Sequence, residues 1–340
     1  MDFKTTALRV FLAGLFLSAS VRGATADETS VSPLEDDSGT VAFVYENDWV
    51  GNSDRNYTNG VRLSYVSKAI VPDGLTETIA DKILNTEEGT RVRWGAALGH
   101  SLFTPDDIET SQPLPDQHPY AAWLYGEFSV FAEKTDQIDQ FTLQLGVVGP
   151  NAGGEWVQNE VHNIVGAPQA RGWDNQIGNE VGVVLSYDRR YRAFRSLNIG
   201  SLGTDITPSF GLSVGNIQTN ARAGVMVRLG EDLRSDYGPS RVRPSLAGAG
   251  YFAPGDNFSW YVFGGVEARA VAHNIFIDGS LFRDSESELS RHTLVGDVQF
   301  GVAWQVYGTQ FGITFVERTD QFEGQTSPHR FGSFSIARKL

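Results

Sequence analysis

Apolar and polar residues alternate with a period of two along most of the chain after residue 38. The runs 61–68, 141–147, 221–229 and 298–306 show this most clearly, with mainly Gly, Gln, Arg, Ser or Thr between the apolar positions. Such alternation is typical of β-strands with two unlike faces. It predicts about twelve strands, at 39–49, 58–69, 91–102, 120–132, 139–149, 179–193, 204–215, 217–230, 258–271, 291–306, 308–319 and 329–340.

This alternation fits either a soluble β-protein or a transmembrane barrel. The runs are about ten residues long, which is the length of a tilted membrane strand. Trp94, Trp123, Trp260 and Trp304 lie near run ends, as interfacial aromatic residues do. The polar face carries Gly, Gln, Arg and Glu, which suits a hydrated lumen better than a dry core. We therefore predict an all-β fold, a transmembrane antiparallel barrel of about twelve strands formed by residues 39–340.

The connections after odd-numbered strands face outward if the N-terminus is periplasmic. Most of the unusual residues then lie on one rim, in the connections 50–57, 103–119, 150–178 and 272–290. The segments 70–90 and 231–257 become long periplasmic connections, although barrels usually keep those short.

The first 26 residues have the features of a cleaved signal peptide. Lys4 and Arg9 flank or precede an apolar run too short to span a bilayer, and residues 24–26 match a small-x-small cleavage site. Residues 27–38 are expected to form a disordered lead-in. Without residues 1–26, the 41 acidic and 27 basic residues become 40 and 24, a net charge of about −16, which argues against nucleic acid as a partner. The chain has no cysteine, so it must be held together without disulfides.

The segment 149–180 departs from the alternation. Gly and Pro residues at 149–154 indicate a turn, and Gly166 with Pro168 ends the stretch that follows. Gln158 and His162 lie one helical turn apart, beside an apolar stripe with helical spacing. The pattern predicts a short helical insertion on the extracellular rim, its stripe formed by Val157, Val161, Ile164 and Val165.

Two groups of residues could carry chemistry. The first spans the end of one strand and the start of the next, with Asn47, Asp48, Asp54 and Thr58. Carboxylate and amide oxygens suit Ca²⁺, but the spacing is not that of an EF-hand, and ordinary turn residues remain the alternative. The second is His162, which is either a general base or a surface or core histidine.

Two further patterns favour structural explanations. Asp106 and Asp107 are interpreted as solvated acids of an outer loop. Residues 211–215 match the G-x-S-x-G esterase pattern, but that motif requires a strand–turn–helix context. Here it lies inside an alternating run, so we predict that Ser213 is not a nucleophile.

These motifs together resemble the outer-membrane lipid A 3′-O-deacylase family of LpxR-like barrels. The similarity covers most of the chain after the signal peptide, and its most specific part surrounds His162. It is carried by Asn47-Asp48, Asp54, Tyr57-Thr58-Asn59-Gly60, Thr104-Pro105, Pro119-Tyr120-Ala121, the segment from Gly149 to His162, Trp173, Gln176-Ile177 and Asn179.

The resemblance implies a Ca²⁺-dependent site on the outer-leaflet side that hydrolyses the acyl ester at the 3′ position of lipid A. It implies that His162 activates water and that Asn47 helps to hold the oxyanion, with Thr58 also in the site. Asp48 falls at a calcium position, and Asp54 is a second candidate ligand. Supporting roles are expected for Gln158, Tyr57 and Asp174.

Two positions differ from the family pattern. The family has a calcium-site glutamate six residues after the histidine, where this chain has Pro168. The family also has a basic residue in the second outer loop that can meet a lipid A phosphate, whereas residues 103–119 contain no Lys or Arg. The candidates for replacing the missing acid are Asp54, Asp174, Glu160 and Glu180.

The sequence therefore favours an outer-membrane ester hydrolase of a Gram-negative bacterium, with lipopolysaccharide and the membrane as its partners. The alternative is a non-enzymatic barrel on the same scaffold, either a small porin or a structural protein, and a soluble secreted β-protein is a third reading. We expect a monomer, although no sequence feature bears directly on the oligomeric state.

Overall fold

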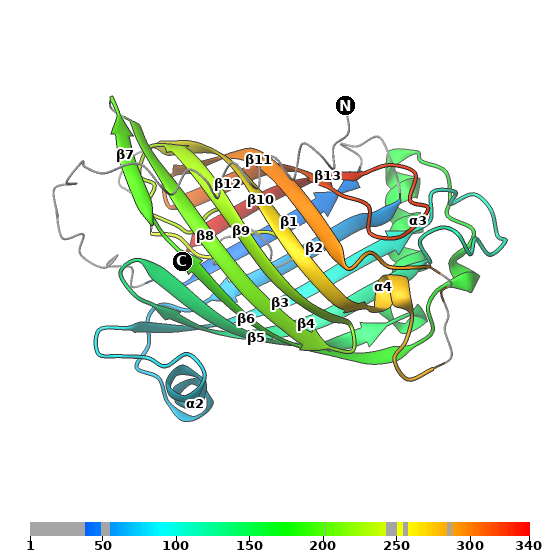
Figure 1. Ribbon diagram of the computed structural model, residues 1–340, viewed down its shortest axis with the longest axis horizontal. Helices are drawn as coiled ribbons and strands as arrows, with labels where there is room; N and C mark the ends of the chain where they lie inside the picture. Colours follow the sequence, from blue (N-terminus) through cyan, green and yellow to red (C-terminus); the bar gives the residue numbers. More distant parts are fainter. Residues whose placement is uncertain are drawn as a thin grey trace. The chain divides into compact units, whose positions relative to one another are not determined.

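The computed structural model describes residues 38–48, 55–200, 202–242, 250–253, 258–283, 287 and 289–340. Within these residues, twelve long antiparallel strands close into a barrel (Figure 1). Each strand pairs with its neighbours in the sequence, and the pairs β1–β13 and β6–β8 complete the ring. The strands are β1 (Thr40–Asn47), β2 (Asn56–Val66), β3 (Arg91–Thr104), β4 (Ala121–Glu133), β5 (Gln137–Val148), β6 (Glu180–Tyr191), β8 (Leu202–Gly215), β9 (Gln218–Gly230), β10 (Ser259–Asn274), β11 (Leu294–Val306), β12 (Thr309–Arg318) and β13 (His329–Lys339).

The predicted barrel of twelve strands is confirmed, and β7 and α2 are among the elements that were not predicted. A short strand, β7 (Arg195–Ile199), pairs with the first residues of β8, while β6 pairs with the later ones. The β7–β8 hairpin therefore extends the wall beyond the ring (Figure 1). Helix α2 (Gly74–Lys82) lies in the connection 70–90 and packs against β4.

The predicted signal peptide and lead-in lie outside the described residues, except for Ser38.

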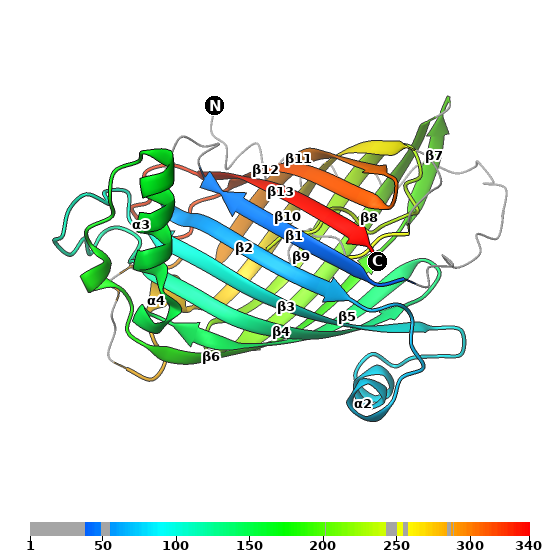
Figure 2. The ribbon, with the colours of Figure 1, turned by 180° about the vertical axis from the view of Figure 1, so that it is seen from behind.

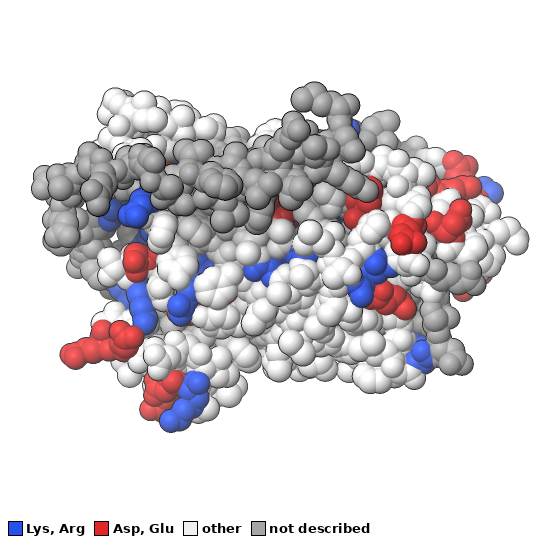
Figure 3. Space-filling model, viewed as in Figure 1, with Lys and Arg blue, Asp and Glu red and all other residues white. Residues whose placement is uncertain are grey.

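The two faces of the wall differ in polarity. Outward-facing positions carry large apolar side chains that are exposed, because no other part of the described chain covers them. On the face seen in Figure 3, acidic side chains gather mainly near the two ends, and the visible wall between them is mostly uncharged apart from some Lys and Arg side chains. An apolar outer belt of this kind suits a hydrocarbon environment. Its members include Phe43, Leu63, Leu98, Leu145, Leu185 and Phe300.

Inward-facing positions carry buried charged residues that pair across the lumen wall. Arg222 lies 2.6 Å from Asp188, and Arg318 lies 2.8 Å from Asp297. A buried charge is costly unless it is paired and hydrogen-bonded. The polar face therefore points into the barrel, as the alternation predicts, but many of its charges pair with one another.

The described part of the connection between β9 and β10, residues 231–242 and 250–253, folds into the lumen. Asp236 accepts hydrogen bonds from Arg228 and Tyr261 near one end of the barrel. Further along, Arg241 reaches Glu46, close to the other end of β1. The expectation of a long periplasmic connection at 231–257 is thus met in length, but its described part lines the inside of the barrel.

Three of the four tryptophans noted above lie on the outer surface near one end of the barrel. Trp94 lies near the start of β3, and Trp260 pairs with Trp304 near the start of β10 and the end of β11. Trp123 is different, because it is buried and stacks on Tyr125 in a cluster of core residues. The interpretation of Trp123 as an interfacial residue is therefore wrong.

The two ends of the barrel differ in what they carry. Helix α3 (Gly154–Val165) and helix α4 (Ile275–Asp278) lie at one end, called here the α3 rim, while α2 lies at the other end (Figures 1 and 2). Two 3-10 turns, η3 (Pro150–Ala152) and η4 (Trp173–Asn175), flank α3. Among the described helices, none is long and apolar enough to cross a bilayer.

Candidate active site between the barrel wall and helix α3

Helix α3 is bounded by glycines in left-handed conformations. Gly153 precedes it with φ of 70°, and Gly166 follows it with φ of 73°. A residue with a side chain is strained at such angles, so glycine is the favoured residue at both ends. The predicted helix and its end at Gly166 agree with the observed one.

The buried face of α3 is not the predicted apolar stripe. The side of the helix turned to the protein carries Gly154, Gln158 and His162, four residues apart. Ile164 and Val165 are 83% and 68% exposed. The rule that an apolar stripe faces a protein core holds in water, whereas on a membrane barrel such a stripe can face the cavity or lipid.

Close packing holds α3 against the wall. A Cβ atom on Gly154 would lie 2.4 Å from the Trp173 ring and 2.6 Å from the Ala122 side chain. Trp173 donates a hydrogen bond from Nε1 to Gln158 Oε1 at 2.8 Å and packs against Tyr120. These contacts fix the helix at its start and middle, and they orient the face that carries His162.

A cavity of about 810 Å³ lies between α3 and the wall formed by β1, β2, β3, β12 and β13. Its lining is mostly apolar, with polar groups concentrated where β1 ends and β2 begins. The lining residues are Tyr45, Asn47, Asp48, Thr58, Asn59, Leu102, Val157, Gln158, Val161, His162, Val165, Gly166, Ala167, Ile313, Thr314, Phe315, Gly332, Ser333 and Phe334.

A β-bulge at Thr58 shapes the polar end of the cavity. The register between β2 and β3 shifts between Tyr57 and Asn59, so Thr58 has no direct partner across the strands. Bulges re-aim side chains. The Thr58 carbonyl accepts a hydrogen bond from Asn47 Nδ2 at 3.1 Å, and the Thr58 hydroxyl lies 2.6 Å from that of Thr104.

Asp48 follows β1 and is 1% exposed. Its Oδ2 atom accepts a hydrogen bond from the backbone amide of Arg55 at 2.7 Å. The Arg55 side chain in turn bonds Asp106 at 2.9 Å, and Asp106 is exposed, as expected of a solvated acid in this outer loop. These contacts tie the start of β2 to the outer loop after β3.

His162 is held by the segment that follows its helix. Its Nδ1 atom forms a short hydrogen bond with the carbonyl oxygen of Pro168. A carbonyl oxygen only accepts, so Nδ1 must carry the proton, and Nε2 is then the basic nitrogen of the neutral ring. Pro168, the position at which the sequence departs from the family pattern, thus contributes its backbone oxygen.

Some candidate residues lie elsewhere. Tyr57 is buried but points to the lumen side, where its hydroxyl donates to Glu46 at 2.9 Å. Asp174 and Glu160 are exposed, and neither borders the cavity. Glu180 also lies away from it, where it bonds Asn216 and Ser280. Asp54 lies outside the described residues.

The polar end of the cavity offers oxygen ligands of the kind that a hard cation prefers. A carboxylate from Asp48, an amide from Asn47 and a hydroxyl from Thr58 are oxygen groups of the kind that Ca²⁺ prefers. The described part of the chain holds no group of three or more His, Cys, Asp or Glu side chains that could bind a metal. The residues therefore fit Ca²⁺ in kind, with a single described carboxylate.

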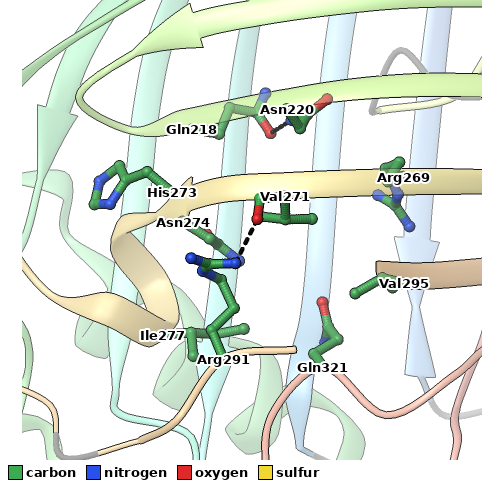
Figure 4. Close-up of a pocket in the computed structure, with 10 residues that line it drawn as sticks. All are labelled: Gln218, Asn220, Arg269, Val271, His273, Asn274, Ile277, Arg291, Val295 and Gln321. Atoms are coloured by element: carbon green, nitrogen blue, oxygen red, sulfur yellow. Dashed lines mark hydrogen bonds between the residues drawn. The ribbon is translucent and has the colours of Figure 1, made fainter. Parts of the chain in front are cut away.

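A second cavity is too small to hold a substrate. It has a volume of about 20 Å³, roughly the space of one water molecule. In Figure 4, Arg291 bonds the backbone of Val271 and Gln218 lies beside Asn220, all inside the barrel near α4. Ser213, which pairs with Asn220 across β8 and β9, bonds Ser186 and Arg222, as a structural residue would.

The sequence analysis did not identify the apolar wall of the larger cavity. Leu102, Ile313, Phe315 and Phe334 look like ordinary lipid-facing residues in the sequence. Only the position of α3 over them makes them part of a site. No local pattern distinguishes them from other outward residues of the same strands.

Comparison with known proteins agrees with this architecture. A family model described as "Outer membrane protein LpxR" matches residues 10–340. LpxR from Salmonella typhimurium has a similar solved structure, with a TM-score of 0.72 and 18% identity over 88% of this chain and 100% of that chain. The β domain of the Bordetella autotransporter Brka has a TM-score of 0.45 and 9% identity over 90% of this chain and 100% of that one. No curated protein sequence matches the chain. The chain belongs to the LpxR family of outer membrane proteins.

Proposed function

We propose that this protein hydrolyses the ester that links the acyloxyacyl group to the 3′ position of lipid A. The observation that carries the proposal is that Asn47, Asp48, Thr58 and His162, remote in sequence, line one cavity against the outer wall of the barrel. A base, hydroxyl and amide groups and a carboxylate lining one mostly apolar cavity suit a lipid ester. Membership of the LpxR family supports the same substrate.

In this proposal His162 is the general base. Its Nε2 atom takes a proton from a water molecule as the water oxygen attacks the ester carbonyl carbon. The protonated imidazole then gives that proton to the 3′ oxygen of the sugar as the carbon–oxygen bond breaks. The products are a sugar with a free 3′ hydroxyl and a free acyloxyacyl fatty acid. The hydrogen bond to Pro168 keeps the ring oriented throughout.

The polar end of the cavity stabilises the charge that develops on the carbonyl oxygen. Asn47, held by its bond to the Thr58 carbonyl, and the Thr58 hydroxyl border this space. Asp48, with neighbouring oxygen groups, would hold Ca²⁺ there. When bound, the cation supplies positive charge beside the ester. The described residues supply one carboxylate to this site, and the affinity for Ca²⁺ rises with ligand charge.

The apolar part of the cavity suits the acyl chains. Val157 and Val161 of α3 face Phe315 and Phe334 of the wall across this space. Burying a methylene group in such a space contributes about 0.8 kcal/mol. The chains can lie along the outer wall, where the membrane already surrounds them, so that only the ester region must enter the polar end.

The test is mass spectrometry of lipid A from a Gram-negative host that expresses this protein. We expect loss of the 3′-linked acyloxyacyl group, and we expect a calcium chelator to prevent that loss in outer-membrane preparations. His162→Gln and Asp48→Asn should each reduce the rate by at least about 100-fold, a typical loss for a general base or an electrostatic stabiliser.

Glu160→Gln serves as the matched control, because Glu160 lies on the same helix but is exposed and away from the cavity. This variant should keep the activity. Unchanged lipid A despite a folded, inserted barrel would rule out this substrate.

A further inference from the structure

A chain of hydrogen bonds connects the lumen to the back of the proposed site. Glu46 is 0% exposed and faces inward from β1, immediately before Asn47. Its Oε2 atom accepts a hydrogen bond from Tyr57, immediately before Thr58, at 2.9 Å. Glu46 thus joins the two strands at the positions that precede two cavity residues.

Tyr57 reaches Glu46 by passing over Gly60. A Cβ atom on Gly60 would lie 1.8 Å from the Tyr57 hydroxyl oxygen, so no larger residue could stand there while the tyrosine keeps its place. The Tyr57 carbonyl bonds His329 at 3.1 Å, and its ring meets Phe331 edge-on. The lumen side of the site is therefore closely packed.

Two further partners of Glu46 come from the connection between β9 and β10. Arg241, 3% exposed, donates from Nε to Glu46 Oε1 at 3.1 Å, and the amide of Val242 donates to the same oxygen at 3.2 Å. Arg241 also donates to Gln299 on β11 at 2.9 Å and lies over the Phe331 ring. A buried carboxylate requires such donors.

We propose that Arg241 is a positioning residue that holds Asn47 and Thr58 in place through Glu46 and Tyr57. This inference rests on the proposed function of the site. The two pairs of neighbouring residues face opposite sides of the wall, so a shift of Glu46 or Tyr57 on the lumen side moves Asn47 or Thr58 on the cavity side. Arg241 lies outside the strands. The hydrogen bonds that it and Val242 donate to Glu46 therefore come from the connection between β9 and β10.

The test compares the removal of Arg241 with the removal of a different buried arginine, Arg222. Arg241→Met removes the support of Glu46, and the double variant E46Q/R241M avoids leaving an unpaired carboxylate while keeping an acceptor for Tyr57. Arg222→Met is the matched control, because Arg222 is also buried and paired with an acid, Asp188, at 2.6 Å on β6. Arg241→Lys keeps the charge and should restore part of the activity.

With folded barrels, we expect R241M and E46Q/R241M to lower kcat on lipid A by about 10- to 100-fold, since a displacement of the order of 1 Å is enough for such a loss. KM should stay within about twofold of the wild type, because the apolar lining is untouched. R222M should change neither. Equal kcat values for R241M and R222M would overturn the inference.

A second measurement does not depend on activity. Hydrogen–deuterium exchange should become faster in peptides covering 45–48 and 57–60 in R241M, but not in R222M. Unchanged exchange in these peptides would overturn the inference whatever the kinetics show. A wild-type protein that leaves lipid A intact would instead contradict the proposed function, and the exchange comparison would still decide the role of Arg241.

Discussion

Thr58 and Thr104 share one hydrogen bond, but only Thr58 borders the cavity. Comparing substitutions at the two positions can therefore distinguish a structural from a catalytic contribution of the Thr58 hydroxyl. Thr58→Val and Thr104→Val both break the bond between the two hydroxyl groups. Each should cost a similar stability of about 1 kcal/mol, the typical net worth of a hydrogen bond.

We predict that T58V lowers kcat on lipid A at least tenfold, whereas T104V stays within about twofold of the wild type, because only T58V removes a hydroxyl from the site. Thr58→Ser should keep most of the activity. The measurement is initial-rate kinetics on purified protein with matched folded fractions. Equal losses in T58V and T104V would mean that the shared bond, not the hydroxyl in the cavity, is what matters.

At the same scale, sequence reasoning found the polar residues of the cavity and missed its apolar ones. Asn47, Asp48, Thr58 and His162 were found because they form motifs that resemble a known family. Tyr57 belongs to the same motif, but the bulge at Thr58 sends it to the lumen. A bulge cannot be read from alternation alone, because one extra residue looks like a short irregularity in the pattern.

At the scale of the element, α3 shows what helical spacing can and cannot predict. The spacing located the helix, and the glycines located its ends. The face that contacts the protein could not be predicted, because the usual assumption that apolar residues face the core fails where lipid replaces water. The buried face instead carries the smallest residue, Gly154, and two polar ones that find partners in η4 and Pro168.

We predict that Gly154→Ala moves α3 away from the wall. The added methyl group would lie within 2.6 Å of Trp173 and Ala122, neither of which can move without disturbing its own packing. Overpacking of this kind costs about 1–3 kcal/mol. Thermal unfolding should show a lower Tm, and the rate of lipid A hydrolysis should fall because His162 moves with the helix.

The control is Glu155→Ala, the next residue on the same helix, whose side chain is exposed. It should leave both Tm and rate close to the wild type. If G154A behaved like E155A, the contact between α3 and Trp173 would not determine the position of the helix.

At the scale of the whole molecule, the number of strands and their order followed from alternation and loop lengths. The inward course of the described residues 231–242 did not, since their contacts with β1, β4 and β11 join residues far apart in the sequence. A connection rich in Asp, Arg, Ser, Gly and Pro has the composition of an ordinary exposed loop. In a polar lumen, that composition is also what a buried segment needs.

The segment inside the lumen argues against the alternative that this protein is a small porin. A barrel of twelve strands is wider than the eight-stranded barrels whose interiors side chains just fill, so an open pore would be possible without an internal segment. Here Tyr125 of β4 donates a hydrogen bond to the carbonyl oxygen of Val242, and Glu46 of β1 accepts hydrogen bonds from Arg241 and Val242. The described part of the segment therefore obstructs the path through the barrel.

We predict that the wild-type protein does not conduct ions in planar bilayers, whereas a variant with residues 232–256 replaced by a short Gly/Ser linker does. The linker variant removes Asp236 and Arg241 and leaves Arg228, Glu46 and Gln299 facing an open lumen, so water and ions can enter. Steady conductance by the wild type would favour the porin. Its absence in both proteins would mean that the strands' own side chains close the lumen, because the segment would then be unnecessary for the seal.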